Sequence, residues 1–187
     1  MPIEYLQEYD RYVMITGVRS AEIPDPKMVL QQLRRSASGI ETQILDAKGV
    51  AGRDHLRFAA LNALKGRAQG IEMTESLAVE VLLYASAQRQ IKNAIAALGV
   101  SSNSRNLAII AIANDRQALE RFEIELPRTV GGKTDESVLE EGDEATVRRI
   151  FGITDNQVRA LVRKDVTERD ALTRLVIEKM ALLSSQI

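Results

Sequence analysis

With 187 residues, of which 45% are hydrophobic and 27% charged, the chain has enough apolar side chains for one well-packed domain and too many for a disordered segment. It contains no cysteine, which excludes a disulfide framework and thiolate metal sites. No stretch reaches the ~18 apolar residues of a membrane helix, and the acidic residues 1–11 do not resemble a signal peptide, so we expect a single cytoplasmic domain over residues 1–187 with no membrane contact.

The net charge of −1 conceals three blocks of different sign. Residues 1–47 carry −2, residues 48–105 carry +4 and residues 106–187 carry −3. Clustered Lys and Arg side chains create a local positive potential that the whole-chain charge does not reveal. The pattern therefore indicates an anionic partner for the middle of the chain, although such blocks are also common in proteins that bind no nucleic acid.

Four segments have the apolar, β-branched or alternating pattern of strands: residues 12–18, 40–45, 107–113 and 122–126. The continuous apolar run of residues 107–113 predicts a central strand. Eight segments have the apolar spacing or the end signals of helices: residues 26–39, 56–68, 74–85, 88–98, 116–121, 143–151, 154–164 and 167–183.

Several local signals support these helices. Asp25 and Pro26 form a typical helix start, and Thr154 with Gln157 forms a capping box. Gly99 is expected to end the helix at residues 88–98 in a left-handed conformation. Residues 127–142 are polar and contain glycine, which predicts a loop between a mixed α/β part over residues 1–126 and C-terminal helices over residues 143–187.

The helix predicted at residues 88–98 has two different faces. Its apolar stripe, expected to pack inward, consists of Ile91, Ala94, Ile95 and Leu98. Its polar face consists of Gln88, Arg89, Lys92 and Asn93. Basic and amide side chains on one helix face can neutralise phosphates and hydrogen-bond sugars or base edges, but the same pattern is typical of an ordinary solvated face.

No motif for catalysis, a metal or a cofactor is convincing. Gly131-Gly132-Lys133-Thr134 copies the end of a P-loop, but Pro127 stands where that motif needs a glycine. His55 is the only histidine, so a catalytic triad or zinc site would depend on it alone. Two interpretations of His55 stay open, which are local hydrogen bonding near a helix start and contact with a phosphate or base. The acidic residues 136–144 have the pattern of a solvated face.

Residues 80–91 (EVLLYASAQRQI), followed by Ala94-Ile95 and Gly99, resemble the small tRNA-recruiting subunit of the KEOPS complex, a Cgi-type family that includes the human PRPK-binding protein. The resemblance continues upstream in residues 43–47 (QILDA) and at His55, and downstream in residues 176–183 (VIEKMALL). Its most specific part is Ser-x-Gln-Arg-Gln-Ile. The chain departs from the family at Ala87, where glycine is preferred, and at Lys179, where arginine is common.

The resemblance implies an α/β (α+β) fold with a small, mainly antiparallel sheet of about four strands, covered by helices and followed by a C-terminal helical bundle. It also implies a non-catalytic role without a cofactor or small-molecule substrate. In that family, KEOPS installs the threonylcarbamoyl group on the adenosine beside the tRNA anticodon, through a separate catalytic subunit. The accessory subunit docks on a kinase-like ATPase and holds the tRNA 3′ CCA end.

This interpretation predicts two binding surfaces. Contact with tRNA is expected from the positive block, at Arg53, His55, Lys65, Arg89, Lys92 and Asn93. Docking on the kinase-like ATPase is expected from apolar side chains of the last two helices, namely Val158, Leu161, Leu172, Leu175, Val176 and Met180. Two other functions stay open: a self-associating structural domain without RNA affinity, and a small enzyme that uses carboxylates and a divalent metal.

Overall fold

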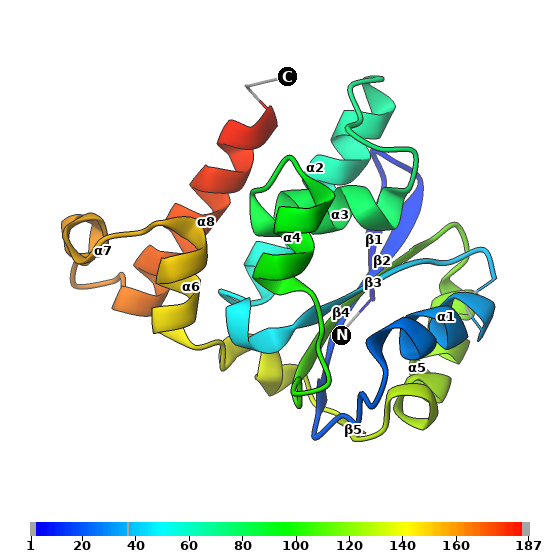
Figure 1. The fold of residues 1–187 in the computed structure, drawn as a ribbon. Coiled ribbons are helices and arrows are strands. Elements are labelled where there is room, and N and C mark those ends of the chain that lie inside the picture. Colours follow the sequence, from blue (N-terminus) through cyan, green and yellow to red (C-terminus); the bar gives the residue numbers. More distant parts are fainter. Residues whose placement is uncertain (1–2, 37, 185–187) are drawn as a thin grey trace.

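The computed structural model describes residues 3–36 and 38–184, and its strands form one antiparallel sheet (Figure 1). Four strands follow the spatial order β1-β2-β4-β3, with bounds β1 (Ile3–Leu6), β2 (Arg11–Arg19), β4 (Leu107–Ala113) and β3 (Glu41–Asp46). A fifth, β5 (Lys133–Thr134), pairs with the end of β2. Every pairing is antiparallel, which confirms the expected sheet type.

Strand β4 is the centre of the sheet, as the apolar run predicts. All of its residues are buried, and it lies between β2 and β3. Successive side chains in a strand point to opposite faces, so Ile110 and Ile112 enter one core while Ile109 and Ala111 enter the other. A strand that is buried on both faces needs helices on both faces.

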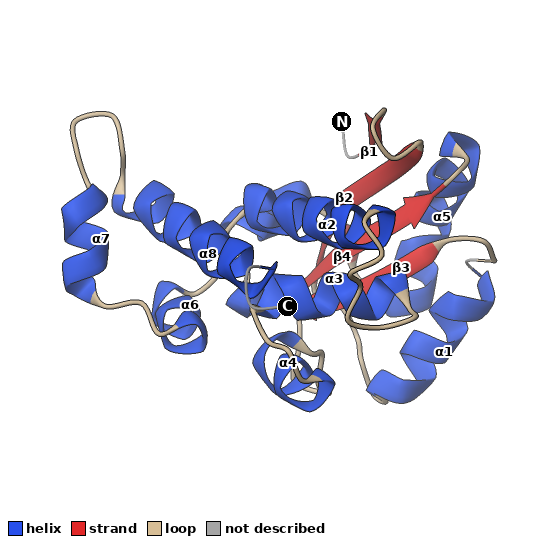
Figure 2. Ribbon diagram, turned by 90° about the horizontal axis from the view of Figure 1, so that it is seen from above, coloured by secondary structure: helices blue, strands red, loops and turns tan. Residues whose placement is uncertain are grey.

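Helices α1 (Pro26–Ser36) and α5 (Arg116–Val130) cover one face of the sheet. Helices α2 (Arg53–Ala68) and α3 (Leu77–Ser86) cover the other, and α4 (Ile91–Leu98) packs on α3 (Figures 1 and 2). Helices α6 (Glu144–Phe151), α7 (Asp155–Leu161) and α8 (Glu168–Ser184) extend this second layer, with α7 farthest from the sheet (Figure 1). We call α6, α7 and α8 the C-terminal arm.

The helix-start signals read from the sequence are confirmed. Asp25 accepts the backbone N–H groups of Lys27 and Met28 at the start of α1. The side chain of Thr154 accepts from the Gln157 backbone, and the Gln157 side chain accepts from the Thr154 N–H group. These side chains supply partners that the first turn of a helix otherwise lacks.

The strand predicted at residues 122–126 is wrong, because this segment lies inside α5. Its buried residues recur at the spacing of one helix face: Leu119, Phe122, Leu126 and Val130. Pro127 also lies within the helix, although proline interrupts the helical hydrogen-bond pattern. Burial of the apolar face therefore outweighs the proline, and the helix continues four residues past the predicted strand.

The segment predicted as a loop over residues 127–142 also has regular structure. It contains the end of α5, strand β5 and a 3-10 helix, η2 (Glu136–Glu140). Gly132 has a φ of 76°, and a Cβ atom there would lie 2.2 Å from the Arg19 carbonyl oxygen. The glycines of the P-loop-like motif thus let this segment approach β2 closely.

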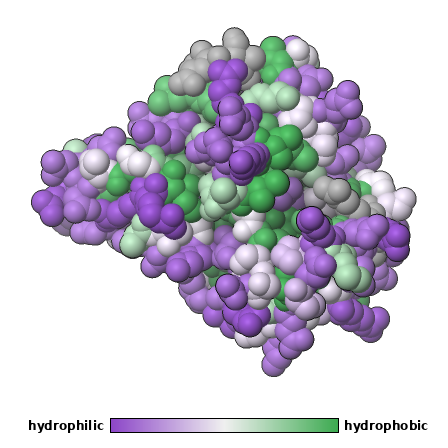
Figure 3. All heavy atoms as spheres, in the orientation of Figure 1, coloured by the Kyte–Doolittle hydropathy of each residue, from purple (hydrophilic) through white to green (hydrophobic). Residues whose placement is uncertain are grey.

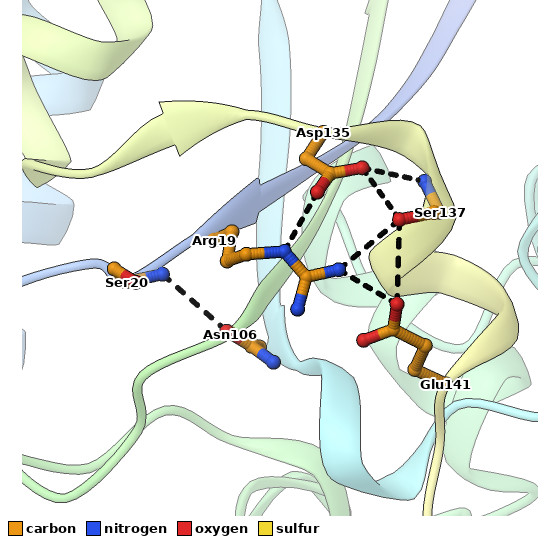
Figure 4. Close-up of polar contacts among 6 residues, drawn as sticks. All are labelled: Arg19, Ser20, Asn106, Asp135, Ser137 and Glu141. Atoms are coloured by element: carbon orange, nitrogen blue, oxygen red, sulfur yellow. Dashed lines mark hydrogen bonds and ion pairs between the residues drawn. The ribbon is translucent and has the colours of Figure 1, made fainter.

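A polar cluster around Arg19 fixes this crossing segment to the sheet (Figure 4). Arg19, at the end of β2, donates from Nε to Asp135 at 2.6 Å and from Nη2 to Glu141 at 2.7 Å. Asp135 also accepts from the Ser137 hydroxyl and backbone N–H groups. The Ser137 hydroxyl and Arg19 lower the pKa of Asp135 to about 2. The cluster therefore joins β2 to the segment that leads into the C-terminal arm.

None of the helices in the described ranges is both long and apolar enough to cross a membrane.

Candidate functional site

The sequence motif of residues 86–91 forms a tight turn between α3 and α4. Helix α3 ends at Ser86, and Ala87 has φ 50° and ψ 37°, which is the left-handed region. The Gln88 N–H group bonds back to the Leu83 carbonyl at 3.0 Å, and the Ser86 hydroxyl donates to the Leu82 carbonyl at 2.8 Å. Glycine adopts this backbone conformation without steric cost, so a glycine would fit this turn better than Ala87 does.

The left-handed cap predicted at Gly99 is wrong. Gly99 has an extended backbone with φ −65°. Its lack of a side chain matters for packing instead, because a Cβ atom would lie 2.4 Å from the Ile95 carbonyl oxygen. The left-handed residue is therefore at the start of the turn, at Ala87, and not at the end of α4.

The motif turn lines a cavity of about 250 Å³ that it shares with the C-terminal arm. We call it the turn cavity, and its lining residues come from three elements: Ser86, Ala87, Gln88, Ile150, Phe151, Lys179, Leu182 and Leu183. The structure therefore brings together residues 80–91 and 176–183, two segments with the family resemblance that are about 85 positions apart in sequence. The sequence did not predict Ile150 and Phe151, because no local pattern places α6 beside this turn.

Basic and amide side chains lie next to the turn cavity. Arg89 follows Gln88 directly, Lys92 and Asn93 belong to the first turn of α4, and all three are exposed. Lys179 contributes a further cation to the cavity wall. Among the described residues that line this cavity, none is acidic. These three predicted RNA-binding residues therefore lie within five positions of the cavity-lining Gln88, and together with Lys179 we call them the rim.

The apolar stripe predicted for α4 is half wrong. Ala94 and Leu98 are buried, but Ile91 and Ile95 are 46% and 53% exposed. The helix packs on α3 through its small and its terminal apolar residues, so the two isoleucines point away from the core. Figure 3 shows hydrophobic surface in the middle of this face, where α4 lies in Figure 1. Two exposed isoleucines therefore share α4 with the cation of Lys92.

Two of the predicted RNA-binding cations lie elsewhere. The Arg53 guanidinium donates to the Ile15 carbonyl at 2.9 Å and forms an ion pair with Glu136. Lys65 is exposed and lines a separate cavity between α2 and α8, with Gln69 and Ala181 among its neighbours. The structure therefore does not unite the six predicted residues in one site, because α2 carries Arg53 and Lys65 away from the turn.

His55 is completely buried, and RNA contact by its side chain is contradicted by this burial. Its Nδ1 atom accepts the Ala51 N–H group at 3.1 Å, and its Nε2 atom lies 2.7 Å from the Ala85 carbonyl oxygen. Burial lowers its pKa to about 4. Of the two interpretations left open by the sequence, local hydrogen bonding is the one that the structure supports.

The predicted docking residues are mostly part of the core. All but Leu161 are at most 7% exposed: Val158, Leu172, Leu175, Val176 and Met180. These five residues therefore do not form the docking surface predicted for them, because α8 packs on α2 and α7 and uses them for its own burial. Among the described residues after Glu144, the large exposed apolar side chains are Val162 at 38% and Leu182 at 49%, and Leu161 is partly buried.

The buried ionisable side chains His55 and Glu80 have structural partners. Buried Glu80 accepts the backbone N–H groups of Met73 and Thr74, and burial raises its pKa. No group of three or more His, Cys, Asp or Glu within residues 3–36 and 38–184 is arranged to hold a metal ion. The turn cavity, with the amide group of Gln88 and the cation of Lys179, is suited to binding an anionic or polar ligand.

Comparison with known proteins agrees with the resemblance seen in the motif. Residues 21–184 match a family model described as "Kinase binding protein CGI-121". The regulatory protein Cgi121 of Methanocaldococcus jannaschii is 30% identical over 173 residues, which cover 91% of this chain and 97% of that protein.

Proposed function

The chain belongs to the CGI-121 family, and on this premise we propose that it is a non-catalytic accessory subunit of the KEOPS complex. In this proposal it binds the kinase-like ATPase subunit and recruits tRNA by its 3′ CCA end for threonylcarbamoyladenosine modification. The description of the matched family as kinase-binding supports the first part, and the regulatory name of the relative agrees with a role that is not enzymatic.

The turn cavity is the proposed place for the tRNA 3′ end. The observation that carries this proposal is that two distant family-like segments meet there, beside a rim of exposed basic residues. Single-stranded RNA ends are recognised by hydrogen bonds to unpaired bases and by flat or apolar contacts. The Gln88 amide, Phe151 and Leu182 supply such groups, and Arg89, Lys92 and Lys179 can neutralise phosphates.

The C-terminal arm is the proposed place for the kinase-like ATPase. Leu161 and Val162, at the end of α7, retain apolar surface in a part of the molecule remote from the sheet. A small apolar patch of this kind, exposed at the end of a helix, is available to a partner. Leu182, a large exposed apolar residue near the other end of the arm, lines the turn cavity, so α8 runs from one proposed surface to the other (Figure 1).

A pair of binding assays tests the proposal. Intact tRNA should bind the isolated chain more tightly than the same tRNA without its CCA end, and added salt should weaken both interactions because phosphate contacts release counterions. The purified kinase-like ATPase should form a complex of defined stoichiometry with the chain in light scattering. Equal affinity for both tRNAs would contradict the CCA site, and self-association with no tRNA or ATPase binding would favour the structural-domain alternative.

A further inference from the structure

The buried imidazole of His55 lies directly behind the turn cavity. His55 belongs to the first turn of α2, yet its contacts are with other elements. Its Nε2 atom reaches the carbonyl of Ala85, one residue before the motif turn, at 2.7 Å. Its ring meets Phe151 edge to face, with centroids 5.4 Å apart and an interplanar angle of 83°. His55 thus contacts two of the three elements that wall the cavity.

The hydrogen bonds of His55 require one neutral form of the ring. Nδ1 accepts the Ala51 N–H group, so it carries no proton, and the proton must be on Nε2 for donation to the Ala85 carbonyl. The Ala85 carbonyl belongs to the last turn of α3, where helix carbonyls lack their usual donors. Because Ala87 turns the chain into the left-handed region, the following backbone leaves the helical path, and His55 supplies the missing donor.

The same ring fixes the position of α8 through Ala51. The Ala51 N–H group is held by His55, and the Ala51 carbonyl accepts the hydroxyl of Thr173, a residue of α8. One side chain therefore connects the motif turn, Phe151 of α6 and, through the backbone of the single residue Ala51, the helix that carries Lys179 and Leu182. These are the three walls of the turn cavity.

We propose that His55 is a positioning residue for RNA binding, which holds the motif turn and Phe151 in the arrangement that forms the turn cavity. This inference rests on the proposed function, and it assigns His55 an indirect role in place of the direct RNA contact expected from the sequence. Residues that support a binding site from behind act by limiting the number of conformations of the groups that touch the ligand.

Three substitutions separate positioning from general stability. His55→Gln keeps a donor near the Nε2 position, His55→Asn keeps an acceptor near Nδ1 but is too short for the Ala85 carbonyl, and His55→Phe keeps the ring without either hydrogen bond. Leu126→Ala is the matched control, since Leu126 is fully buried in the core on the other face of the sheet. Its loss should lower stability without touching the cavity.

The free chains are first compared by amide hydrogen exchange over residues 83–93. His55→Asn and His55→Phe should accelerate exchange of this segment, whereas His55→Gln and Leu126→Ala should accelerate it much less at temperatures where all remain folded. Unchanged exchange in His55→Asn and His55→Phe would overturn the positioning role. If His55→Phe does not fold, the comparison of Asn with Gln still decides the question.

The affinity for intact tRNA is then measured below the unfolding temperature of each variant. We expect an affinity loss of about ten-fold or more in His55→Asn, rescue to within about three-fold in His55→Gln, and wild-type affinity in Leu126→Ala. Affinity that follows stability alone, with Leu126→Ala as weak as His55→Asn, would also overturn the inference. If the wild-type chain binds no tRNA, the proposed function fails, and hydrogen exchange alone then decides whether His55 positions the turn.

Discussion

Replacing Ala87 by glycine should stabilise the protein slightly, although alanine-to-glycine changes usually destabilise. Ala87 has φ 50° and ψ 37°, and this left-handed conformation costs a non-glycine residue about 1–2 kcal/mol. Glycine removes that cost. The substitution therefore tests whether the motif turn has the backbone geometry seen here.

Two opposing effects reduce the gain. Glycine makes the unfolded chain more flexible, which costs about 0.4–1 kcal/mol. The half-buried methyl group of Ala87 packs against the core, and its loss costs roughly 0.4 kcal/mol, half the value of a fully buried carbon. The net expectation is a stabilisation of about 0.4 kcal/mol at the midpoint of these ranges.

Ala96→Gly provides the matched control. Ala96 is exposed within α4, where glycine costs about 1 kcal/mol. Urea unfolding should therefore separate the two variants by about 1.4 kcal/mol in the free energy of unfolding, with Ala87→Gly the more stable. In a protein of this size the separation corresponds to about 3–5 °C in Tm. If Ala87→Gly loses as much stability as Ala96→Gly, the left-handed turn is refuted.

Three further outcomes are expected. The pKa of Asp135 lies near 2, below its unfolded value of about 4, so its stabilising effect is present above pH about 4 and disappears as the pH falls through 2. The urea midpoints of wild type and Asp135→Asn should therefore differ at pH 6 and converge near pH 2. A difference that stays constant with pH would argue against the Arg19 cluster. Lys92→Glu should weaken tRNA binding about ten-fold or more at low salt, whereas Lys27→Glu on α1, behind the sheet, should not; equal effects would remove α4 from the RNA site. Val162→Asp should weaken ATPase binding in titration calorimetry by about 1–2 kcal/mol. The control Ile124→Asp introduces the same charge at an exposed position of α5 and should have no effect. Unchanged binding of the ATPase by Val162→Asp would exclude the end of α7 from the interface.

Elements with a strong local pattern could be predicted from the sequence. The continuous apolar run of β4, the cap of α1 at Asp25 and the capping box of α7 are each specified by neighbouring residues, and the structure confirms them. The misreading of residues 122–126 shows the limit of such signals. Pro127 and the short β-like run suggested a strand and a break, but the helical spacing from Leu119 to Val130 determines the outcome through burial.

The candidate site also has one part that the sequence could predict and one part that it could not. The motif at residues 86–91 and its basic rim could be found from sequence, because residue types and spacing alone define them. Phe151 could not be connected with them, since a contact across some 60 positions leaves no local trace. The docking residues proposed on α7 and α8 failed for a related reason: an apolar stripe shows that a helix face is buried but does not show whether its own domain or a partner buries it.

The sequence by itself determined the family, the sheet with its central apolar strand, and a candidate segment that combines a turn with cations. Only the tertiary structure decided that His55 faces inward, that Ile91 and Ile95 face outward, and that α8 closes the turn cavity. The physical reason is that hydrogen-bond caps and side-chain periodicity act within one helix or strand. Burial of a particular residue depends instead on which distant elements pack against it, and that is settled when the whole core forms.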